Sequence, residues 1–379
     1  MKSCEDVEME NTSLNNFPSK KLSILISGYY GSKNGGDEAM LAAMLEVLRE
    51  IGGEISATVI SLNPEYTRKR HHIDAVPWLD VWTIIKKIRA ADLLISGGGS
   101  LLQNVTSRRS LYYYLGIIFL AQIFGCRVML YAQGIGPIRG ALARWLMNFI
   151  VNRVDLITVR DHGSLEEIRR LNITRPKIFC TADPVLAINP VPLDIGEKIL
   201  ARHGVEKSGK LVGVSVRRWI DWQNCQSALA AALDEIAGTG AKIIFIPMQF
   251  PNDIQAARET AALMKNPAAV VDDELSTAET LSLVGNMSAV IAIRLHALIF
   301  AGVMGVPMLG ISYDPKIDRF LDSIGEKPLG TLADVTADKI SATTLKKLGA
   351  ENSHDEALLK NLRELARQNA RLALELLAK

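Results

Sequence analysis

The sequence predicts an α/β protein built from two Rossmann-like domains that face each other across a cleft. Strand-like runs rich in Val, Ile and Leu alternate with helical patterns along the chain. Such near-continuous apolar runs are typical of parallel strands covered by helices on both faces. The chain has 379 residues, which is too long for one ordinary hydrophobic core. Three prolines between residues 184 and 192 interrupt the alternation, and we expect the interdomain linker there.

Two series of strands and helices are expected in order along the chain. In the first series, strands are expected at residues 22–27, 55–61, 92–96, 127–132, 155–160 and 177–182, and helices at 37–51, 110–124, 141–153 and 163–171. In the second series, strands are expected at residues 211–216, 242–247, 268–271, 289–293 and 307–312. Leucines then recur near helical spacing between residues 351 and 379, which predicts one long amphipathic helix.

These patterns divide the chain into three parts. Residues 1–20 are polar and acidic, and we expect them to form a disordered extension. Residues 21–186 are expected to form the first Rossmann-like domain and residues 187–379 the second. The final helix, 351–379, could pack back on the first domain.

Composition excludes several classes of function. The chain is 48% hydrophobic and 22% charged with a net charge of +2, and its lysines and arginines are dispersed, so no nucleic-acid partner is expected. The cysteines show no metal-ligand spacing, and His162 and His203 stand alone, so no metal site is expected. No Gly-x-Ser-x-Gly elbow or Cys/His pair supports covalent acyl chemistry. Cationic electrostatics and acid–base catalysis remain as the expected chemistry.

The start of the chain and its longest apolar run bear on location. Residues 1–17 are unlike the basic and apolar start of a signal peptide, and a cytoplasmic protein is expected. Leu111–Cys126 is shorter than the ~20 residues that a membrane-spanning helix needs, and it contains Gln122. We expect a buried helix or one that rests on a membrane surface, and Leu111–Leu115 leaves a peripheral contact with the inner face of the membrane open.

Glycine-rich turns follow three strands of the first series, at residues 28–36, 97–99 and 134–136. Glycine allows a ligand to approach the backbone closely, and a helix N-terminus favours anions. Three such turns suggest an open crevice, with a tight turn as the alternative for residues 97–99. Neither a dinucleotide fingerprint nor a P-loop is present, so the ligand is not readable from spacing alone. Asp37 could be a helix N-cap, or Asp37 or Glu38 could contact a substrate hydroxyl.

Basic side chains follow three strands of the second series. Arg217 and Arg218 come after the strand at 211–216, and one of them is well placed to bind a carboxylate or phosphate. Arg294 and His296 come where the strand at 289–293 gives way to a helix, and Lys316 comes after the strand at 307–312. Because ligands of parallel sheets bind at the carboxyl ends of strands, these side chains are expected to surround a small anionic ligand. The alternatives are a structural ion pair for Arg294, a core histidine for His296, and surface positions for Arg217, Arg218 and Lys316.

The chain resembles the polysaccharide pyruvyl transferase family, most closely the bacterial enzymes that pyruvylate secondary cell-wall polymers. The segments that carry the resemblance span most of the chain after residue 20, and they are 28–41, 92–104, 131–137, 157–161, 182–185 and 293–316. The resemblance implies a GT-B-like fold, phosphoenolpyruvate as donor substrate, and no separate cofactor. It also implies an acceptor side in the first domain and a donor side in the second.

The resemblance assigns roles to the residues already singled out. It implies phosphoenolpyruvate binding by Arg217, Arg294, Lys316 and, from the first domain, Arg139, with His296 as general acid or base. Asp37 is a further catalytic candidate. The candidate acceptor-binding residues are Gly31, Glu38, Gly98, Gly99 and Gln133.

The implied reaction moves pyruvate from phosphoenolpyruvate to a sugar, expected to be N-acetylmannosamine on a lipid-linked precursor. A cyclic 4,6-ketal forms and phosphate leaves. The alternatives are a nucleotide-sugar glycosyltransferase of the same architecture and a non-catalytic protein that binds sugar or phosphate. The oligomeric state is not readable from the sequence.

Overall fold

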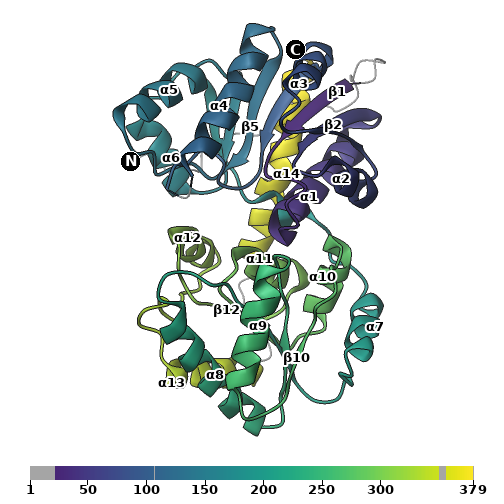
Figure 1. The fold of residues 1–379 in the computed structure, drawn as a ribbon, viewed down its shortest axis with the longest axis vertical. Coiled ribbons are helices and arrows are strands. Elements are labelled where there is room, and N and C mark those ends of the chain that lie inside the picture. The colour runs from purple at the N-terminus through teal and green to yellow at the C-terminus, as the bar shows by residue number, and fades with distance from the viewer. Residues whose placement is uncertain (1–21, 106, 350–355, 379) are drawn as a thin grey trace. The chain divides into compact units, whose positions relative to one another are not determined.

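The computed structural model describes residues 22–105, 107–349 and 356–378. The chain forms two compact units (Figure 1). Unit 1 comprises Met1–Ser32, Met40–Ala187 and Glu364–Lys379, and unit 2 comprises Lys33–Ala39 and Ile188–Arg363. The expected extension at residues 1–20 lies outside the described residues, as do residues 351–355 of the expected final helix.

Unit 1 is built on a seven-stranded parallel sheet in the order β3-β2-β1-β4-β5-β6-β7. Its strands are β1 (Leu22–Ser27), β2 (Ile55–Ser61), β3 (Asp74–Pro77), β4 (Leu93–Gly97), β5 (Arg127–Gln133), β6 (Leu156–Val159) and β7 (Lys177–Cys180). The connecting elements are α1 (Gly35–Gly52), α2 (Pro64–His71), α3 (Val81–Ala90), α4 (Arg108–Ile123), α5 (Ala141–Val151), α6 (His162–Arg170) and the 3-10 helix η1 (Pro184–Ala187). The first turn of α1 is grouped with unit 2.

Unit 2 is built on a five-stranded parallel sheet in the order β10-β9-β8-β11-β12. Its strands are β8 (Leu211–Ser215), β9 (Lys242–Phe245), β10 (Ala268–Val270), β11 (Ala289–Ala292) and β12 (Met308–Gly310). Its helices are α7 (Asp194–Arg202), α8 (Trp222–Gly238), α9 (Asn252–Leu263), α10 (Thr277–Gly285), α11 (Leu295–Met304), α12 (Pro315–Ser323), α13 (Ala337–Leu348) and the beginning of α14 (Glu356–Ala378).

The predicted α/β class with two parallel sheets is confirmed. The expected strands at residues 22–27 and 55–61 match β1 and β2, and the other expected strands end one to two residues from the observed ones. β3 and the helices on either side of it were not predicted. β3 has only four residues, between Asp74 and Pro77, and α2 carries six polar or charged residues in eight, so neither shows an apolar period. Segment 33–39, expected in the first domain, is grouped with unit 2.

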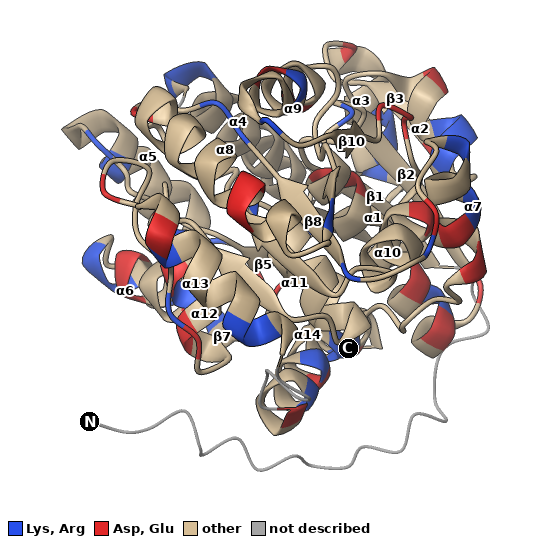
Figure 2. Cartoon of the chain, turned by 90° about the horizontal axis from the view of Figure 1, so that it is seen from below, with Lys and Arg blue, Asp and Glu red and all other residues tan. Residues whose placement is uncertain are grey.

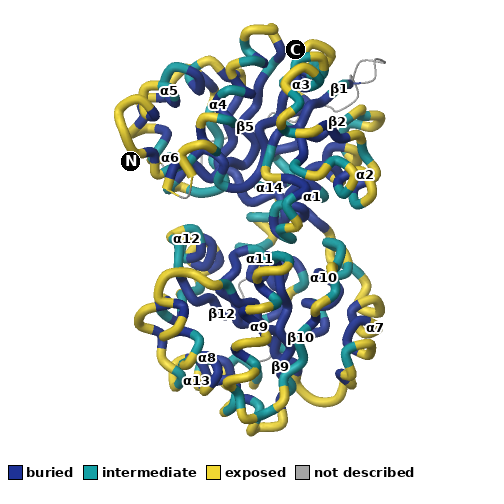
Figure 3. Tube along the Cα trace, in the orientation of Figure 1, coloured by how far each residue is buried: buried dark blue, intermediate teal, exposed yellow. Residues whose placement is uncertain are grey.

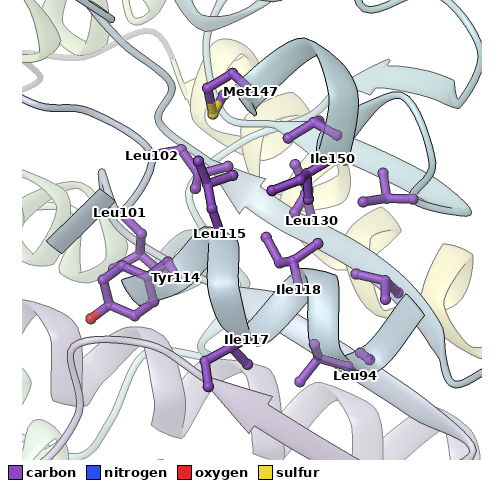
Figure 4. Close-up of a cluster of buried hydrophobic side chains, with 14 of the residues drawn as sticks. Leu94, Leu101, Leu102, Tyr114, Leu115, Ile117, Ile118, Leu130, Met147 and Ile150 are labelled. Carbon is purple, nitrogen blue, oxygen red and sulfur yellow. The ribbon is translucent and has the colours of Figure 1, made fainter. Parts of the chain in front are cut away.

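Charged residues lie mainly on the helices and loops around the two sheets (Figure 2). The strands themselves are largely buried (Figure 3), as the apolar runs predicted. In unit 1, α4 presents Leu115 and Ile118 to a core that includes Leu130 of β5 and Met147 of α5 (Figure 4). Among the described residues, no helix combines the length and the apolar character needed to cross a bilayer.

The end of α14 is held in unit 1 by polar contacts as well as apolar ones. Asn369 is fully buried; its amide donates to the carbonyl oxygen of Ala182 at 3.2 Å, and its Oδ1 accepts from the Thr181 hydroxyl at 2.8 Å. Arg367 also pairs with Glu50 of α1 at 2.6 Å. A fully buried amide with satisfied hydrogen bonds favours one defined position for this helix.

Candidate active site

Three adjacent strands of unit 2 end beside one another. β11 lies between β8 and β12, with Ala292 paired to Ser215 on one side and to Gly310 on the other. All three strands run parallel, so the segments that follow them emerge at the same edge of the sheet. Those segments contain Arg217, Arg294 with His296, and Lys316. We call Arg217, Arg294 and Lys316 the cationic cluster, and His296 follows the same strand as Arg294.

Arg217 is held between two aromatic rings. Its guanidinium carbon lies 4.6 Å from the Trp219 ring centroid and 4.7 Å from that of Tyr313, and its Nη1 donates to the Tyr313 hydroxyl at 2.5 Å. Burial lowers the pKa of Arg217 from its ordinary value, and the nearby charge of Arg294 lowers it further. Arginine nevertheless stays protonated at any working pH. The result is an oriented, partly desolvated cation.

Lys316 also lies near the ring of Tyr313. Its Nζ lies 5.3 Å from the Tyr313 ring centroid and 3.3 Å from Oδ2 of Asp314. Asp314 caps α12 by accepting from the Lys316 amide at 3.1 Å, and Pro315 occupies the first turn, where its missing N–H is not needed. The cap therefore sets the position of Lys316, and Tyr313 connects it to Arg217.

The two arginines after β8 have different partners. Arg218 forms an ion pair with Glu259 of α9, and both side chains are 43% exposed. Arg217, by contrast, is directed to Tyr313. Of this pair, Arg217 is the residue that belongs to the cluster. Arg218 also helps to line a pocket of about 590 Å³, together with Trp219, Trp222 and Asn224.

Arg294 forms a buried ion pair, the alternative that the sequence left open, with a partner that the sequence did not identify. Its Nε donates to Oδ2 of Asp253 at 2.9 Å and its Nη2 to Oδ1 at 2.5 Å, in a bidentate geometry. The side chains are 9% and 2% exposed. Nη2 also donates to Oε1 of Gln249 at 2.9 Å. Most of the N–H groups of the Arg294 guanidinium thus donate to protein groups. A role for Arg294 in binding phosphoenolpyruvate stays a prediction.

Asp253 links that ion pair to the loop after β9. Its Oδ2 also accepts from the backbone amides of Met248 and Gln249, at 3.2 and 3.0 Å. The carbonyl oxygen of Met248 in turn accepts from the amide of Gly35 at 2.7 Å. Asp253 therefore connects Arg294 to the first turn of α1, all within unit 2.

His296 packs against that first turn of α1. A Cβ atom placed on Gly36 would lie only 2.0 Å from Nδ1 of His296, so the imidazole occupies the space where a side chain would begin. Asn34 holds the turn by accepting from the Gly36 amide at 3.1 Å. The glycine at this position is therefore needed for the position of the histidine.

Asp37 and Glu38 follow in the same turn but differ in exposure. Because α1 begins at Gly35 and Asn34 accepts from its first turn, the alternative of Asp37 as N-cap is wrong. Asp37 is half-buried, whereas Glu38 is fully buried. The structure therefore does not present the Glu38 carboxylate at the surface, and an acceptor contact by Glu38 stays a prediction.

The other candidate acceptor residues lie in unit 1 and are buried. A Cβ atom on Gly31 would lie 2.3 Å from the Ser61 hydroxyl, and one on Gly98 would lie 3.2 Å from Met40 Sδ. Gly31, Gly98 and Gly99 also have positive φ. Packing and backbone conformation thus account for Gly31, Gly98 and Gly99, and an open crevice at the glycine-rich turns stays a prediction. Gln133 is fully buried, and its amide donates to the Ser96 carbonyl at 3.0 Å.

Arg139, the candidate donor ligand from the first domain, lies in unit 1. Asn104 holds its backbone on both sides: it accepts from the Arg139 amide at 2.8 Å and donates to the Arg139 carbonyl at 2.7 Å. The Arg139 residue is exposed. The structure thus gives a defined backbone position for this arginine, and its donor-binding role stays a prediction.

Unit 1 also contains a buried ion pair within the segments that carry the family resemblance. Arg160 follows β6, and its Nη1 lies 3.2 Å from Oδ2 of Asp183, with both side chains 6% exposed. Its Nη2 donates to the Ser100 hydroxyl at 3.1 Å and lies against the backbone of Gly134. These contacts tie together the segments that follow β4, β5, β6 and β7, which explains Arg160 and Asp183 as structural.

Sequence reasoning missed four residues of the unit 2 site. Trp219 lies two residues after Arg217 and Tyr313 three residues before Lys316, and aromatic rings this near to basic residues were an available signal. Asp253 and Gln249 lie more than forty positions from Arg294, and no spacing rule connects them to it. The structure also brings His203 near Asp272 and Asp273, but Arg202 pairs with Asp273 and Arg258 with Asp272, which offsets the acidic charge.

Comparison with known proteins agrees with the sequence pattern. Residues 34–315 match the family described as polysaccharide pyruvyl transferase. A curated relative, the amylovoran biosynthesis protein AmsJ of Erwinia amylovora, is 20% identical over 256 residues. That match covers 63% of this chain and 61% of the relative, so the chain spans less than two thirds of the relative's length.

Solved structures show the fold. UDP-GlcNAc 2-epimerase from Methanocaldococcus jannaschii has a TM-score of 0.62 at 12% identity, covering 92% of this chain and 99% of that one. Anabaena HepE in complex with UDP-glucose has a TM-score of 0.59 at 12% identity, covering 94% and 98%. At such low identity these proteins indicate a GT-B-like architecture and carry no information on substrate.

Proposed function

The chain belongs to the polysaccharide pyruvyl transferase family, and we propose that it transfers pyruvate from phosphoenolpyruvate to a sugar of a lipid-linked polysaccharide precursor. We propose N-acetylmannosamine as the sugar and a cyclic 4,6-ketal as the product. The observation that carries this proposal is the cationic cluster at the ends of β8, β11 and β12. Phosphoenolpyruvate has a phosphate and a carboxylate, and the cluster supplies cations for both.

We assign Arg217 and Lys316 to direct donor binding. Arg217 is oriented by Tyr313 and Trp219, and its planar guanidinium suits a carboxylate or a phosphate. Lys316 supplies a second cation near the same tyrosine. We do not assign Arg294 to direct phosphoenolpyruvate binding, because its Nε and Nη2 atoms donate to Asp253 and Gln249. Its proposed role is to hold the loop after β9 in position.

The proposed reaction begins with proton transfer to C3 of phosphoenolpyruvate, which makes C2 electrophilic. A sugar hydroxyl forms a bond to C2, the C2–O bond to phosphate breaks, and a second hydroxyl of the same sugar closes the ketal. Of the two hydroxyl protons, one balances the proton gained at C3 and the other leaves with phosphate. His296 is the proposed general acid or base, since imidazole transfers protons near neutral pH.

The test is incubation of the full chain with phosphoenolpyruvate and a lipid-linked acceptor that ends in N-acetylmannosamine. We expect release of inorganic phosphate and a product heavier than the acceptor by one pyruvic acid less one water. Parallel reactions replace phosphoenolpyruvate with a nucleotide sugar. Turnover of the nucleotide sugar, with none of phosphoenolpyruvate, would favour the glycosyltransferase alternative, and saturable binding without phosphate release would favour a non-catalytic protein.

A further inference from the structure

A long part of unit 1 contains basic residues but no acidic ones. No Asp or Glu occurs between Asp92 and Asp155, a stretch that includes α4 and α5. The same stretch contains six arginines, which are Arg108, Arg109, Arg127, Arg139, Arg144 and Arg153. The charged residues of α4 and α5 are therefore arginines only (Figure 2). Two helices that contain basic but no acidic residues favour an anionic partner.

α4 has large apolar side chains on its outer face. Tyr112, Phe119 and Ile123 are 41%, 38% and 58% exposed, and their spacing places them along one side of the helix. Gly116 lies on the same side, and a Cβ atom there would meet nothing within 4 Å. The opposite face of α4 is the one that packs into the core (Figure 4). The apolar side chains on the outer face of α4 are therefore not part of the hydrophobic core.

α5 continues this face. Leu142 and Trp145 are 63% and 58% exposed. The Trp145 ring stacks on Phe149 with centroids 5.3 Å apart, and Phe149 in turn lies 6.3 Å from Phe119 of α4. The two helices therefore share one aromatic surface. We call the exposed set Tyr112, Phe119, Ile123, Leu142 and Trp145 the α4–α5 surface.

Arginines lie around the edge of the α4–α5 surface. The Arg153 guanidinium lies 3.8 Å from the Phe149 ring centroid, and that of Arg89 on α3 lies 5.6 Å from the ring of Phe124, next to Ile123. Arg144 is exposed beside Trp145. Contiguous exposed apolar residues are rare on soluble proteins and mark interaction sites. Apolar and aromatic residues bordered by arginine are typical of helices that lie in the interface of a bilayer.

We propose that the α4–α5 surface binds the surface of an anionic phospholipid bilayer. The aromatic and aliphatic side chains would enter the boundary between headgroups and acyl chains, where tryptophan is favoured. The surrounding arginines would pair with lipid phosphates, and the stretch itself contributes no Asp or Glu that would repel them. This binding does not depend on the proposed reaction, and it is measured without substrates.

The experiment is flotation of the full chain with vesicles of phosphatidylcholine alone and with vesicles that also contain phosphatidylglycerol. We expect binding to the anionic vesicles, weaker binding as salt rises, and little binding to the neutral ones. Phe119→Ser with Trp145→Ser should weaken binding at least tenfold. Arg144→Ser with Arg153→Ser should weaken it about fivefold for each arginine, the fold-change that corresponds to ~1 kcal/mol per charge near the membrane.

Matched substitutions on unit 2 control for nonspecific effects. Leu263→Ser with Leu345→Ser removes two exposed apolar side chains there, and Lys198→Ser with Lys207→Ser removes two exposed cations. Both control variants should bind anionic vesicles as the wild type does. Circular dichroism and thermal melting of every variant separate loss of binding from loss of folding.

Three outcomes would overturn the proposal. The first is no binding of the wild type to anionic vesicles, and the second is equal binding by the α4–α5 variants and the wild type. The third is concentration-dependent self-association, seen in sedimentation velocity, that Phe119→Ser with Trp145→Ser abolishes while vesicle binding is unchanged. That result would assign the surface to a second copy of the chain.

Discussion

The imidazole of His296 occupies the position that a side chain on Gly36 would need. The distance from His296 Nδ1 to an ideal Gly36 Cβ is 2.0 Å, whereas real Cβ atoms do not approach other atoms closer than 3.0 Å. One of the two residues must therefore move if Gly36 acquires a side chain. Since His296 is the proposed acid or base, this contact links the start of α1 to the chemistry.

Gly36→Ala is expected to lower activity nearly as much as His296→Ala. General acid–base catalysis contributes roughly 10²–10⁴-fold to rate, so His296→Ala should lower kcat by that factor without preventing folding. Gly36→Ala should lower kcat by displacing the imidazole. Phosphate release from phosphoenolpyruvate measures both.

Gly238→Ala is the matched control for the glycine substitution. Gly238 ends α8 in the same unit, and a Cβ atom there would meet nothing within 4 Å. This variant should keep full activity. Wild-type turnover in both His296→Ala and Gly36→Ala would remove the histidine from the mechanism.

Asp253→Ala is expected to destabilise the protein strongly. The substitution leaves the Arg294 guanidinium buried without its bidentate partner, and breaking a buried ion pair costs about 3–5 kcal/mol. Glu259→Ala, which removes the partner of the exposed Arg218, should cost at most about 1 kcal/mol. Urea denaturation gives the free energy of unfolding for each. Similar values for the two variants would contradict the assignment of Asp253 as a buried structural partner.

Arg217→Lys is expected to raise the KM for phosphoenolpyruvate by about ten- to a hundredfold, because a charge-assisted hydrogen bond contributes about 1.5–3 kcal/mol. Lysine keeps the charge but loses the planar group that stacks between Trp219 and Tyr313. Arg218→Lys should leave this KM unchanged. Steady-state kinetics with varied phosphoenolpyruvate measure the KM of each variant. A larger increase in KM for Arg218→Lys than for Arg217→Lys would assign phosphoenolpyruvate binding to Arg218 instead.

Lys87→Met should lower stability near neutral pH but not in acid. The hydrogen bond from Lys87, at 2.6 Å, holds the pKa of Asp74 below its ordinary value, although partial burial of the carboxyl acts the other way. A carboxyl with a lowered folded-state pKa stabilises the fold above its unfolded pKa of about 3.9, and this contribution is lost as pH falls through the folded-state pKa.

The expected loss for Lys87→Met at neutral pH is at most about 1 kcal/mol, because the pair is partly exposed. The difference between variant and wild type should shrink below about pH 4. Urea denaturation at the two pH values measures it, with Lys69→Met, at an exposed position of α2, as the control. A difference that grows on acidification would show that another group dominates.

Cys126 and Cys225 should resist alkylation in the folded protein. Burial raises the pKa of the Cys126 thiol to about 11 and that of Cys225 to about 12. Only the thiolate reacts, so at pH 8 roughly one Cys126 in a thousand is in the reactive form, and access is restricted as well. Mass spectrometry after iodoacetamide treatment, with and without urea, checks this. Rapid labelling without urea would mean that the segments around Cys126 and Cys225 open readily.

The sequence was a good guide to the strands and to which segments follow them. Near-continuous apolar runs such as residues 22–27 are typical of covered parallel strands, and the positions of Arg217, Arg294 and Lys316 after strand ends follow from them. It was a poor guide to β3, which with four residues is too short to show a period.

Tertiary structure alone decided what each candidate side chain contacts. Asp253 reaches Arg294 across 41 positions of sequence, and no local pattern carries such a pairing. The same holds for Gly36, which belongs to the first glycine-rich turn but packs on a histidine of the second series. Local hydrophobic periodicity determined the elements, because burial of a strand or a helix face depends on neighbours in sequence. The partners of charged groups depend on how distant strands pair, so only the folded chain decided between a residue that binds a ligand and one that holds the fold.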